Sequence, residues 1–285
     1  MGRVELFDIK GKVAVVTGGG GILCKSMAKD LGLNGAKVAV LDLRKDAAEA
    51  AAKEIADAGG EAIGVECNVL VKESLEAACN TILAKFGKID ILINGAGGNS
   101  PKATTSKDQL TPEDCKNAVE GVKTFFDLDS DGVQFVFNLN FLGTLLPTQV
   151  FGRVLAEQGG GTIINVSSMN AFRPLTRIPA YSAAKAGISN FTQWLSTHFA
   201  PVNVRVNAIA PGFFLTDQNR FLLTDEKTGQ LTQRGSTIMS HTPMGRFGDP
   251  SDLCGTLLWL VSDASAFVTG IVVPVDGGFS AFSGV

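Results

Sequence analysis

The sequence predicts a single α/β domain built on a doubly wound parallel sheet of seven strands. Short runs of apolar, β-branched residues alternate along the chain with longer amphipathic segments, a pattern typical of repeated strand–helix–strand units. The chain has 285 residues, of which 45% are hydrophobic, so it can bury one large core. Crossovers between parallel strands are right-handed, and we therefore expect helices on both faces of the sheet.

Seven short apolar runs are the expected strands, at residues 13–17, 37–42, 62–66, 89–94, 161–167, 202–209 and 271–275. Helices are expected between them, most clearly at residues 45–58, 72–86 and 180–199, where good helix formers follow an amphipathic register. Two stretches interrupt the alternation and predict binding loops: an inserted loop at about 98–132 and a substrate loop at about 212–248. Both return to the same sheet, so the domain is expected to span residues 1–285.

Composition argues against several classes of function. Charged residues make up 19% of the chain and its net charge is −3, so it lacks the basic field that nucleic acid or an anionic membrane surface attracts. The first twelve residues lack the apolar core of a signal peptide, which predicts a cytoplasmic protein. Five scattered cysteines suit reduced thiols, and two histidines do not suffice for a His-rich metal cage. We expect no nucleic acid, membrane or metal partner.

A glycine-rich turn after the first expected strand is a candidate nucleotide site. The segment VVTGGGGIL covers residues 15–23, and glycine permits both positive φ and the close approach of a pyrophosphate to a helix N-terminus. A plain strand-to-helix turn is the alternative. Asp42 ends the second strand, where a carboxylate accepts ribose hydroxyls and repels a 2′-phosphate, which favours NAD over NADP. Arg44 could reverse that preference, and Asp42 could instead cap the helix that begins near Lys45.

Tyr181 and Lys185 are the candidate acid–base pair. They are four residues apart on an expected helix, so their side chains lie about one turn from each other. An ammonium and a cationic nicotinamide both favour the phenolate and would bring the tyrosine toward use as a base. Such pairs are also common on helix surfaces. The interpretation of this pair as catalytic is strengthened by Ser168, which follows an apolar strand at the edge where parallel sheets bind ligands.

Along nearly its whole length the chain resembles the short-chain dehydrogenase/reductase family. The matching pieces are TGGGGIL, Asp42, NGAG at 94–97, NFLG at 140–143, Ser168, Tyr181 with Lys185, Pro211-Gly212 and DGG at 276–278. The resemblance implies a Rossmann-type fold, an NAD-dependent oxidoreductase and a homotetramer. It implies that Tyr181 is the general acid/base and that Ser168 binds the reacting oxygen. It also implies that Lys185 lowers the pKa of the tyrosine and holds the nicotinamide ribose, while Asn140 anchors a water in the proton relay.

The same resemblance implies the cofactor contacts, which are Gly18, Gly20, Gly21, Ile22, Leu23, Asp42, Asn68, Val69, Asn94, Gly95, Ala96, Tyr181, Lys185, Pro211, Gly212, Phe214 and Thr216. The sequence departs from the family pattern in the glycine turn, whose spacing is one residue shorter and which has Leu23 in place of the third glycine. Asn68 replaces an aspartate, and Gly95 replaces the second asparagine of NNAG. A helix cap at Asn140 and a core turn at 94–97 are the alternatives.

Within the family the likeness is strongest to sugar-acid enzymes of the D-mannonate oxidoreductase, or fructuronate reductase, branch. It rests on TGGGGILC, SSMNAFRPLTRIPAYSAAKAG and APGFFLTDQNRFLL. A sugar acid carries a carboxylate and hydroxyls, which guanidinium and amide groups bind. The candidate residues are Asn170, Arg173, Arg177, Gln218, Asn219 and Arg220, each of which could instead be solvent-facing or salt-bridged. The alternatives are a reductase of another carbonyl (keto-gluconate, sugar, steroid or 3-oxoacyl thioester) and a non-catalytic nucleotide-binding regulator.

Overall fold

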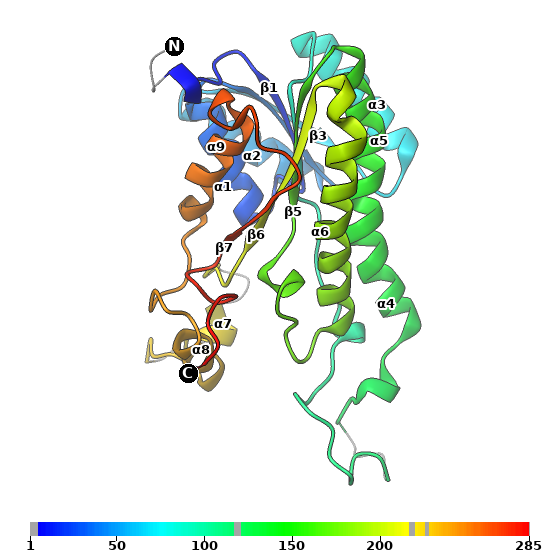
Figure 1. Cartoon of the computed structure of the whole chain (residues 1–285), viewed down its shortest axis with the longest axis vertical. Coiled ribbons are helices and arrows are strands. Elements are labelled where there is room, and N and C mark those ends of the chain that lie inside the picture. Colours follow the sequence, from blue (N-terminus) through cyan, green and yellow to red (C-terminus); the bar gives the residue numbers. More distant parts are fainter. Residues whose placement is uncertain (1–4, 117–120, 217–219, 226–227, 285) are drawn as a thin grey trace.

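Seven parallel strands form one sheet in the order β3–β2–β1–β4–β5–β6–β7 in the computed structural model, which describes residues 5–116, 121–216, 220–225 and 228–284 (Figure 1). The strands are β1 (Val13–Thr17), β2 (Lys37–Asp42), β3 (Glu61–Glu66), β4 (Ile91–Asn94), β5 (Gly161–Val166), β6 (Val204–Pro211) and β7 (Val272–Val275). Each neighbouring pair is parallel. The predicted fold class is confirmed.

Predicted strand bounds agree with the structure to within about two residues. The largest shifts, of two residues, are at the start of β4 and at both ends of β6, which starts at Val204. A short 3₁₀ turn, Ala200–Val202, precedes it, and Asn203 has a left-handed backbone (φ 57°) that reverses the chain into the strand. Such a turn follows from local backbone geometry that an apolar run does not reveal.

Two groups of helices cover the two faces of the sheet (Figure 1). α1 (Ile22–Leu33), α2 (Lys45–Asp57) and α9 (Cys254–Val261) pack against the alternate strand residues that include Ala14 and Val16. α3 (Lys72–Phe86), α5 (Gly143–Glu157) and α6 (Pro179–Phe199) pack against the intervening residues, among them Val13 and Val15. Both faces of the central strands are therefore buried, as expected for a parallel sheet.

The carboxyl ends of the strands carry the two interrupting stretches, which project below the sheet in Figure 1. The stretch predicted as an inserted loop contains 3₁₀ turns at Pro101–Ala103 and Phe125–Asp127, and α4 (Ser130–Phe137) begins within its last residues. The second stretch contains α7 (Arg220–Leu223) and α8 (Gln233–Ser240). Further 3₁₀ turns lie at Glu5–Phe7, Met169–Ala171, Pro250–Leu253 and Asp263–Ser265.

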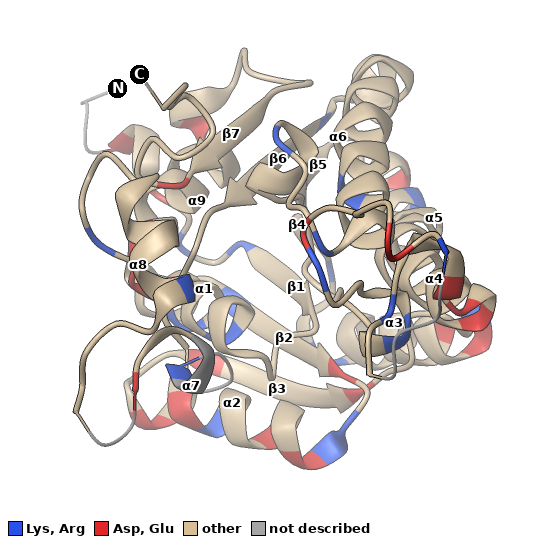
Figure 2. Cartoon of the chain, turned by 90° about the horizontal axis from the view of Figure 1, so that it is seen from below, with Lys and Arg blue, Asp and Glu red and all other residues tan. Residues whose placement is uncertain are grey.

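The strand order reverses beside β1, because the chain builds β2 and β3 on one side and β4 to β7 on the other. Ligands of open parallel sheets bind in the crevice at such a switch point, outside the carboxyl ends of the strands. Figure 2 views the molecule from this end and shows the loops arranged around it. Within the described residues, no helix combines the length and apolar character needed to cross a bilayer.

Candidate active site

The glycine turn between β1 and α1 has a shape that only glycine allows. Gly18 has φ +63°, and a Cβ on it would lie 2.9 Å from the Cα of Ala96. A Cβ on Gly20 would lie 2.7 Å from the Cβ of Ala47 and 2.8 Å from Oδ2 of Asp42. Gly21 caps α1 with no side-chain hydrogen bond, so no side chain competes for the N–H groups of the first helical turn. The turn fits a bound pyrophosphate.

Asp42 ends β2 beside this turn. Its Oδ2 accepts a hydrogen bond from the Gly20 N–H at 3.1 Å, and its Oδ1 accepts one from the Arg44 N–H at 3.1 Å. The residue at the N-cap of α2 is Arg44, which makes no side-chain cap. The helix-cap alternative for Asp42 is therefore not what the structure shows. Its carboxylate instead ties the second strand to the glycine turn, the place predicted for a ribose-binding group.

The side chain of Asn94 lies in the core. It is 1% exposed, and its Nδ2 donates to Thr148 Oγ1 and Asn165 Oδ1, both at 2.9 Å. The N–H groups of Gly95 and Ala96 both donate to Thr17 Oγ1, at 3.1 and 3.2 Å. The core-turn alternative thus describes Asn94 well, since its side chain joins β4 to β5 and α5.

Asn68 and Val69 follow β3 and shape a turn of their own. The Oδ1 of Asn68 accepts a hydrogen bond from the N–H of Leu70 at 3.0 Å, and the Asn68 N–H donates to Ser74 Oγ at 2.9 Å. Val69 is buried and lies against Gly143, where a Cβ would come within 3.2 Å of its Cγ2. The side-chain acceptor of Asn68 is therefore used within the turn.

Ser168, Tyr181 and Lys185 come together at the carboxyl end of β5. Ser168 follows the strand, is 8% exposed, and accepts a hydrogen bond from the Asn170 N–H at 3.2 Å. Tyr181 lies in the first turn of α6, and the Ser168 side chain is close enough to the phenol to lower its pKa. The Nζ of Lys185 lies 5.6 Å from the centre of the Tyr181 ring. The structure thus assembles the three side chains that the sequence predicted as a unit.

Burial shifts the pKa of both titratable members. It raises the pKa of the Tyr181 phenol, with the hydrogen bond from Ser168 acting in the opposite direction. It lowers the pKa of Lys185 to about 8, opposed by the nearby Cys24 thiol. Lys185 is 4% exposed and its Nζ donates to the carbonyl oxygen of Val166 at 2.7 Å. In the chain alone the phenol is therefore protonated at neutral pH, the form that can donate a proton to a carbonyl.

Asn140 lies in a π-helical turn, Asn138–Leu142, between α4 and α5. Its fully buried Nδ2 donates to the carbonyl oxygens of Gly98 and Val136, both at 2.7 Å, and its Oδ1 accepts from the Gly98 N–H at 3.3 Å. Asn140 therefore ties the loop after β4 to the last turn of α4, and its bond to the Val136 carbonyl is the kind of contact that the helix-cap alternative describes. A Cβ on Gly97 would lie 2.8 Å from Asn140 Oδ1 and 3.2 Å from Lys185 Nζ, so this loop joins the two residues.

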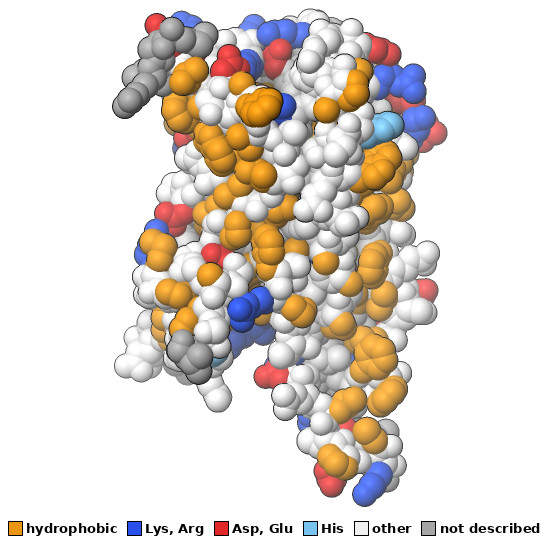
Figure 3. All heavy atoms as spheres, in the orientation of Figure 1, with side chains coloured by type: hydrophobic (Ala, Val, Ile, Leu, Met, Phe, Trp, Pro, Cys, Tyr) orange, Lys and Arg blue, Asp and Glu red, His pale blue; other side chains and the backbone are white. Residues whose placement is uncertain are grey.

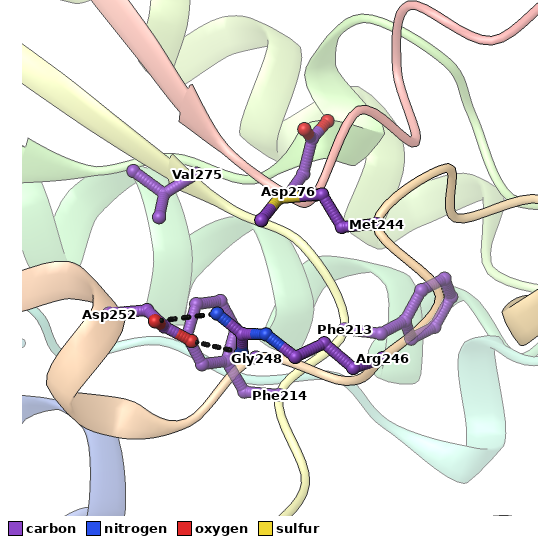
Figure 4. A pocket seen from close by; sticks show the side chains of 9 residues that line it. Phe213, Phe214, Met244, Arg246, Gly248, Asp252, Val275 and Asp276 are labelled. Atoms are coloured by element: carbon purple, nitrogen blue, oxygen red, sulfur yellow. Dashed lines mark hydrogen bonds and ion pairs between the residues drawn. The ribbon is translucent and has the colours of Figure 1, made fainter.

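The loop after β6 is held by the loop after β7. A Cβ on Gly212 would lie 2.5 Å from the Cα of Asp276. Phe214 is 4% exposed and packs on Gly248, so its side chain belongs to the core. A cavity of about 170 Å³ lies beside it. Figure 4 shows the lining side chains, among which the Arg246 guanidinium donates two hydrogen bonds to the Asp252 carboxylate, at 2.6 and 2.9 Å. These contacts fix the backbone of the segment that the resemblance assigns to the nicotinamide.

The predicted substrate residues differ in their surroundings. Asn170 is 3% exposed, and its Oδ1 has no hydrogen-bond partner among the described residues. Arg173 is exposed, Arg220 begins α7, and Gln218 and Asn219 lie outside the described residues. The Nε of Arg177 donates to Oδ1 of Asp108 at 2.6 Å. Sequence reasoning missed Asp108, because a single aspartate in a polar insertion has no spacing that relates it to a site.

One edge of the parallel sheet carries three features: the glycine turn, the acidic end of β2 and the Ser168–Tyr181–Lys185 cluster. Together they define the active site of a nucleotide-dependent dehydrogenase. A family model for the short chain dehydrogenases matches residues 12–227, and the chain belongs to this family. The predicted enzyme class, an oxidoreductase, is thereby confirmed.

Three relatives show what this chain resembles. A crystal structure from Haemophilus influenzae, provisionally described as a D-mannonate oxidoreductase with bound NAD, is 53% identical, covers 98% of both chains and has a TM-score of 0.91. A 2-dehydro-3-deoxy-D-gluconate 5-dehydrogenase from Formosa agariphila is 34% identical over 99% of this chain and 97% of its own length. A 7alpha-hydroxysteroid dehydrogenase from Escherichia coli K12 is 30% identical over 95% and 94%. The substrates in these descriptions differ, so family membership alone does not fix the substrate.

Proposed function

We propose that this protein is an NAD-dependent dehydrogenase that interconverts a ketone and a secondary alcohol on a sugar acid, with D-fructuronate and D-mannonate as the pair. The observation that carries the reaction type is the cluster of Ser168, Tyr181 and Lys185 at the carboxyl end of β5. The NAD in the 53% identical relative supports the cofactor. Because all three side chains are present and lie together, the cluster also argues against the alternative of a non-catalytic nucleotide-binding regulator.

The residues predicted to bind the cofactor would do so through backbone N–H groups and through the charge of one carboxylate. The N–H groups at the start of α1, behind Gly18 to Gly21, would bind the pyrophosphate. Asp42 would accept the hydroxyls of the adenosine ribose, and its negative charge would repel the 2′-phosphate of NADP. When bound as NADH, the cofactor supplies the hydride.

In the reductive direction the chain's own groups handle the carbonyl oxygen and its proton. The Ser168 hydroxyl would bind the carbonyl oxygen and hold it beside the phenol. Tyr181, protonated because burial raises its pKa, would donate its proton to that oxygen as negative charge develops. The Lys185 ammonium would stabilise the phenolate that remains and hold the nicotinamide ribose. Asn140 would position the loop after β4 and a water that returns the proton.

Two observations favour an acidic polyhydroxylated substrate over a steroid. Arg173 and Arg177 lie in the segment between Ser168 and Tyr181, and guanidinium groups bind carboxylates with paired hydrogen bonds. Asn170 adds a buried amide oxygen without a partner in the described structure, a suitable acceptor for a substrate hydroxyl. The descriptions of the first two relatives name sugar acids. A homotetramer and a cytoplasmic location complete the proposal.

A substrate panel tests the proposal. NADH oxidation would be followed with D-fructuronate, keto-gluconates, D-fructose, a 7-oxo steroid and a 3-oxoacyl thioester, each repeated with NADPH. We expect the highest kcat/KM for D-fructuronate with NADH. A higher value for the steroid or the thioester would overturn the substrate class, and a higher value with NADPH would overturn the cofactor.

A further inference from the structure

The inserted segment contacts the loop that joins the two catalytic residues Ser168 and Tyr181. The N–H of Thr105 donates to the carbonyl oxygen of Arg177 at 2.9 Å. The Asp108 carboxylate accepts from Arg177 Nε at 2.6 Å and from Thr176 Oγ1 at 3.0 Å, both through Oδ1. Arg177 lies two residues before α6, whose first turn carries Tyr181. An aspartate of the insertion therefore holds an arginine of the segment that leads into the catalytic helix.

The way Asp108 binds Arg177 leaves most of the guanidinium available. A guanidinium has five N–H donors in one plane, and Asp108 uses the one on Nε. In the part of the chain that the structure describes, neither terminal nitrogen of Arg177 has a hydrogen-bond acceptor, and its side chain is 45% exposed. The planar edge formed by Nη1 and Nη2 matches a carboxylate, which binds such an edge through two parallel hydrogen bonds.

The Asp108 carboxyl is ionised where it binds Arg177. The hydrogen bonds from Arg177 and Thr176 lower the pKa of this carboxyl. Asp108 therefore stays a charged acceptor near neutral pH and keeps its bond to the Arg177 guanidinium.

We propose that Asp108 is a positioning residue that fixes the plane of Arg177, so that the free edge of this arginine binds the carboxylate of the substrate. This inference rests on the proposed sugar-acid function and assigns a role to the insertion: it selects acidic substrates over neutral ones. Asp108 touches no reacting atom, and its effect passes through Arg177.

The test compares one acidic and one neutral ketone of similar shape, D-fructuronate and D-fructose. In the variants D108A and R177K we expect the KM for D-fructuronate to rise roughly tenfold with little change in kcat. In D108A the guanidinium is no longer held in one plane, and in R177K the ammonium cannot present two parallel donors to a carboxylate. The kinetic constants for D-fructose and the KM for NADH should stay unchanged. The matched control is D131N, which removes a charge from an exposed aspartate at the start of α4.

Each outcome decides a separate point. Equal losses with both ketones in D108A would show that the insertion has a structural role only, and a lower KM for D-fructuronate would show that Asp108 competes with the substrate. Either result overturns the inference while leaving the proposed function intact. If the wild-type enzyme reduces no sugar acid, the proposed function fails and the inference fails with it. Unchanged discrimination in R177K would exclude this arginine as the carboxylate ligand.

Discussion

Lys185 shows at the level of one residue how function can oppose stability. The residue is 4% exposed, and burial lowers the pKa of its ammonium to about 8, which means that the fold disfavours the charged form. The cost of burying the charge is therefore present below pH 8 and disappears as the pH rises toward the ordinary lysine value near 10.5. A residue retained despite such a cost is a strong candidate for a functional role.

We predict that Lys185→Met removes activity but does not weaken the fold. A thioether of similar length removes the buried charge, so the free energy of unfolding at pH 7 should rise by about 1–3 kcal/mol. Turnover should fall by at least about a hundredfold, because the phenolate loses its counter-charge. Urea unfolding at pH 7 and pH 10 together with NADH oxidation would measure both effects. A variant less stable than wild type at pH 7 would show that Lys185 mainly serves the core.

The pH dependence of the reaction should report the same lysine. The kcat/KM for NADH reflects groups of the free enzyme, and the ammonium of Lys185 loses its proton as the pH rises through about 8. We therefore expect kcat/KM for NADH to decline above pH 8 during ketone reduction. The phenol of Tyr181 stays protonated there because burial raises its pKa. A profile measured from pH 6 to 10 that stays flat through pH 9 would contradict this assignment.

At the level of elements, the glycine turn depends on contacts that a single methyl group would break. A Cβ on Gly20 would lie 2.7 Å from the Cβ of Ala47 and 2.8 Å from Asp42 Oδ2, both closer than van der Waals contact allows. We predict that Gly20→Ala displaces the turn and raises the KM for NADH roughly tenfold or more, because the backbone that faces the pyrophosphate moves. The position of Asp42 would shift with it.

The matched control for that variant is Gly255→Ala. Gly255 is exposed in α9 and a Cβ there would have no neighbour within 4 Å, so the change should leave the KM for NADH unaltered. Steady-state kinetics with NADH as the varied substrate would measure both variants. Equal KM values in Gly20→Ala and wild type would show that the cofactor does not approach this turn.

The elements that the sequence predicted share one property, which is that their signal is local and periodic. Helix 72–86 matches α3 at both ends, because an amphipathic register and a glycine stop delimit it. The π-helical turn that holds Asn140 has no such signal, since it differs from a helix by one extra residue per turn. The bond between Asp108 and Arg177 joins residues 69 positions apart, and only the folded chain brings them together.

The spacing of Ser168, Tyr181 and Lys185 identified the chemistry, because four residues on a helix fix the distance between two side chains. The direction of a side chain was harder to predict. Asn94 ends β4 and Phe214 lies in the loop after β6, yet both side chains point into the core, where burial and packing decide their orientation. The resemblance implies that Lys185 lowers the pKa of Tyr181, but in this chain burial raises that pKa, and the opposing effect comes from Ser168 and not from the lysine.

At the scale of the whole molecule, exposed aromatic side chains gather on the side formed by α6 and α4. Figure 3 shows hydrophobic side chains gathered along the right side, over the helices that Figure 1 labels α6 and α4. Trp194 on α6 is 55% exposed, and its ring stacks on that of His198 with centroids 4.6 Å apart. Phe135 and Phe137 on α4 are 49% and 40% exposed. Exposed apolar surface of this kind is typical of contacts between subunits.

If the predicted homotetramer uses this side, Trp194→Asp should reduce the assembly to smaller species, because a buried unpaired carboxylate opposes association. Light scattering after size-exclusion chromatography should give about four times the chain mass of 29.8 kDa for wild type and a lower multiple for the variant. Leu33→Asp is the matched control, since Leu33 is 54% exposed at the end of α1 on the other face of the sheet. A variant that remains tetrameric would place the contact elsewhere, and a monomeric wild type would refute the assembly itself.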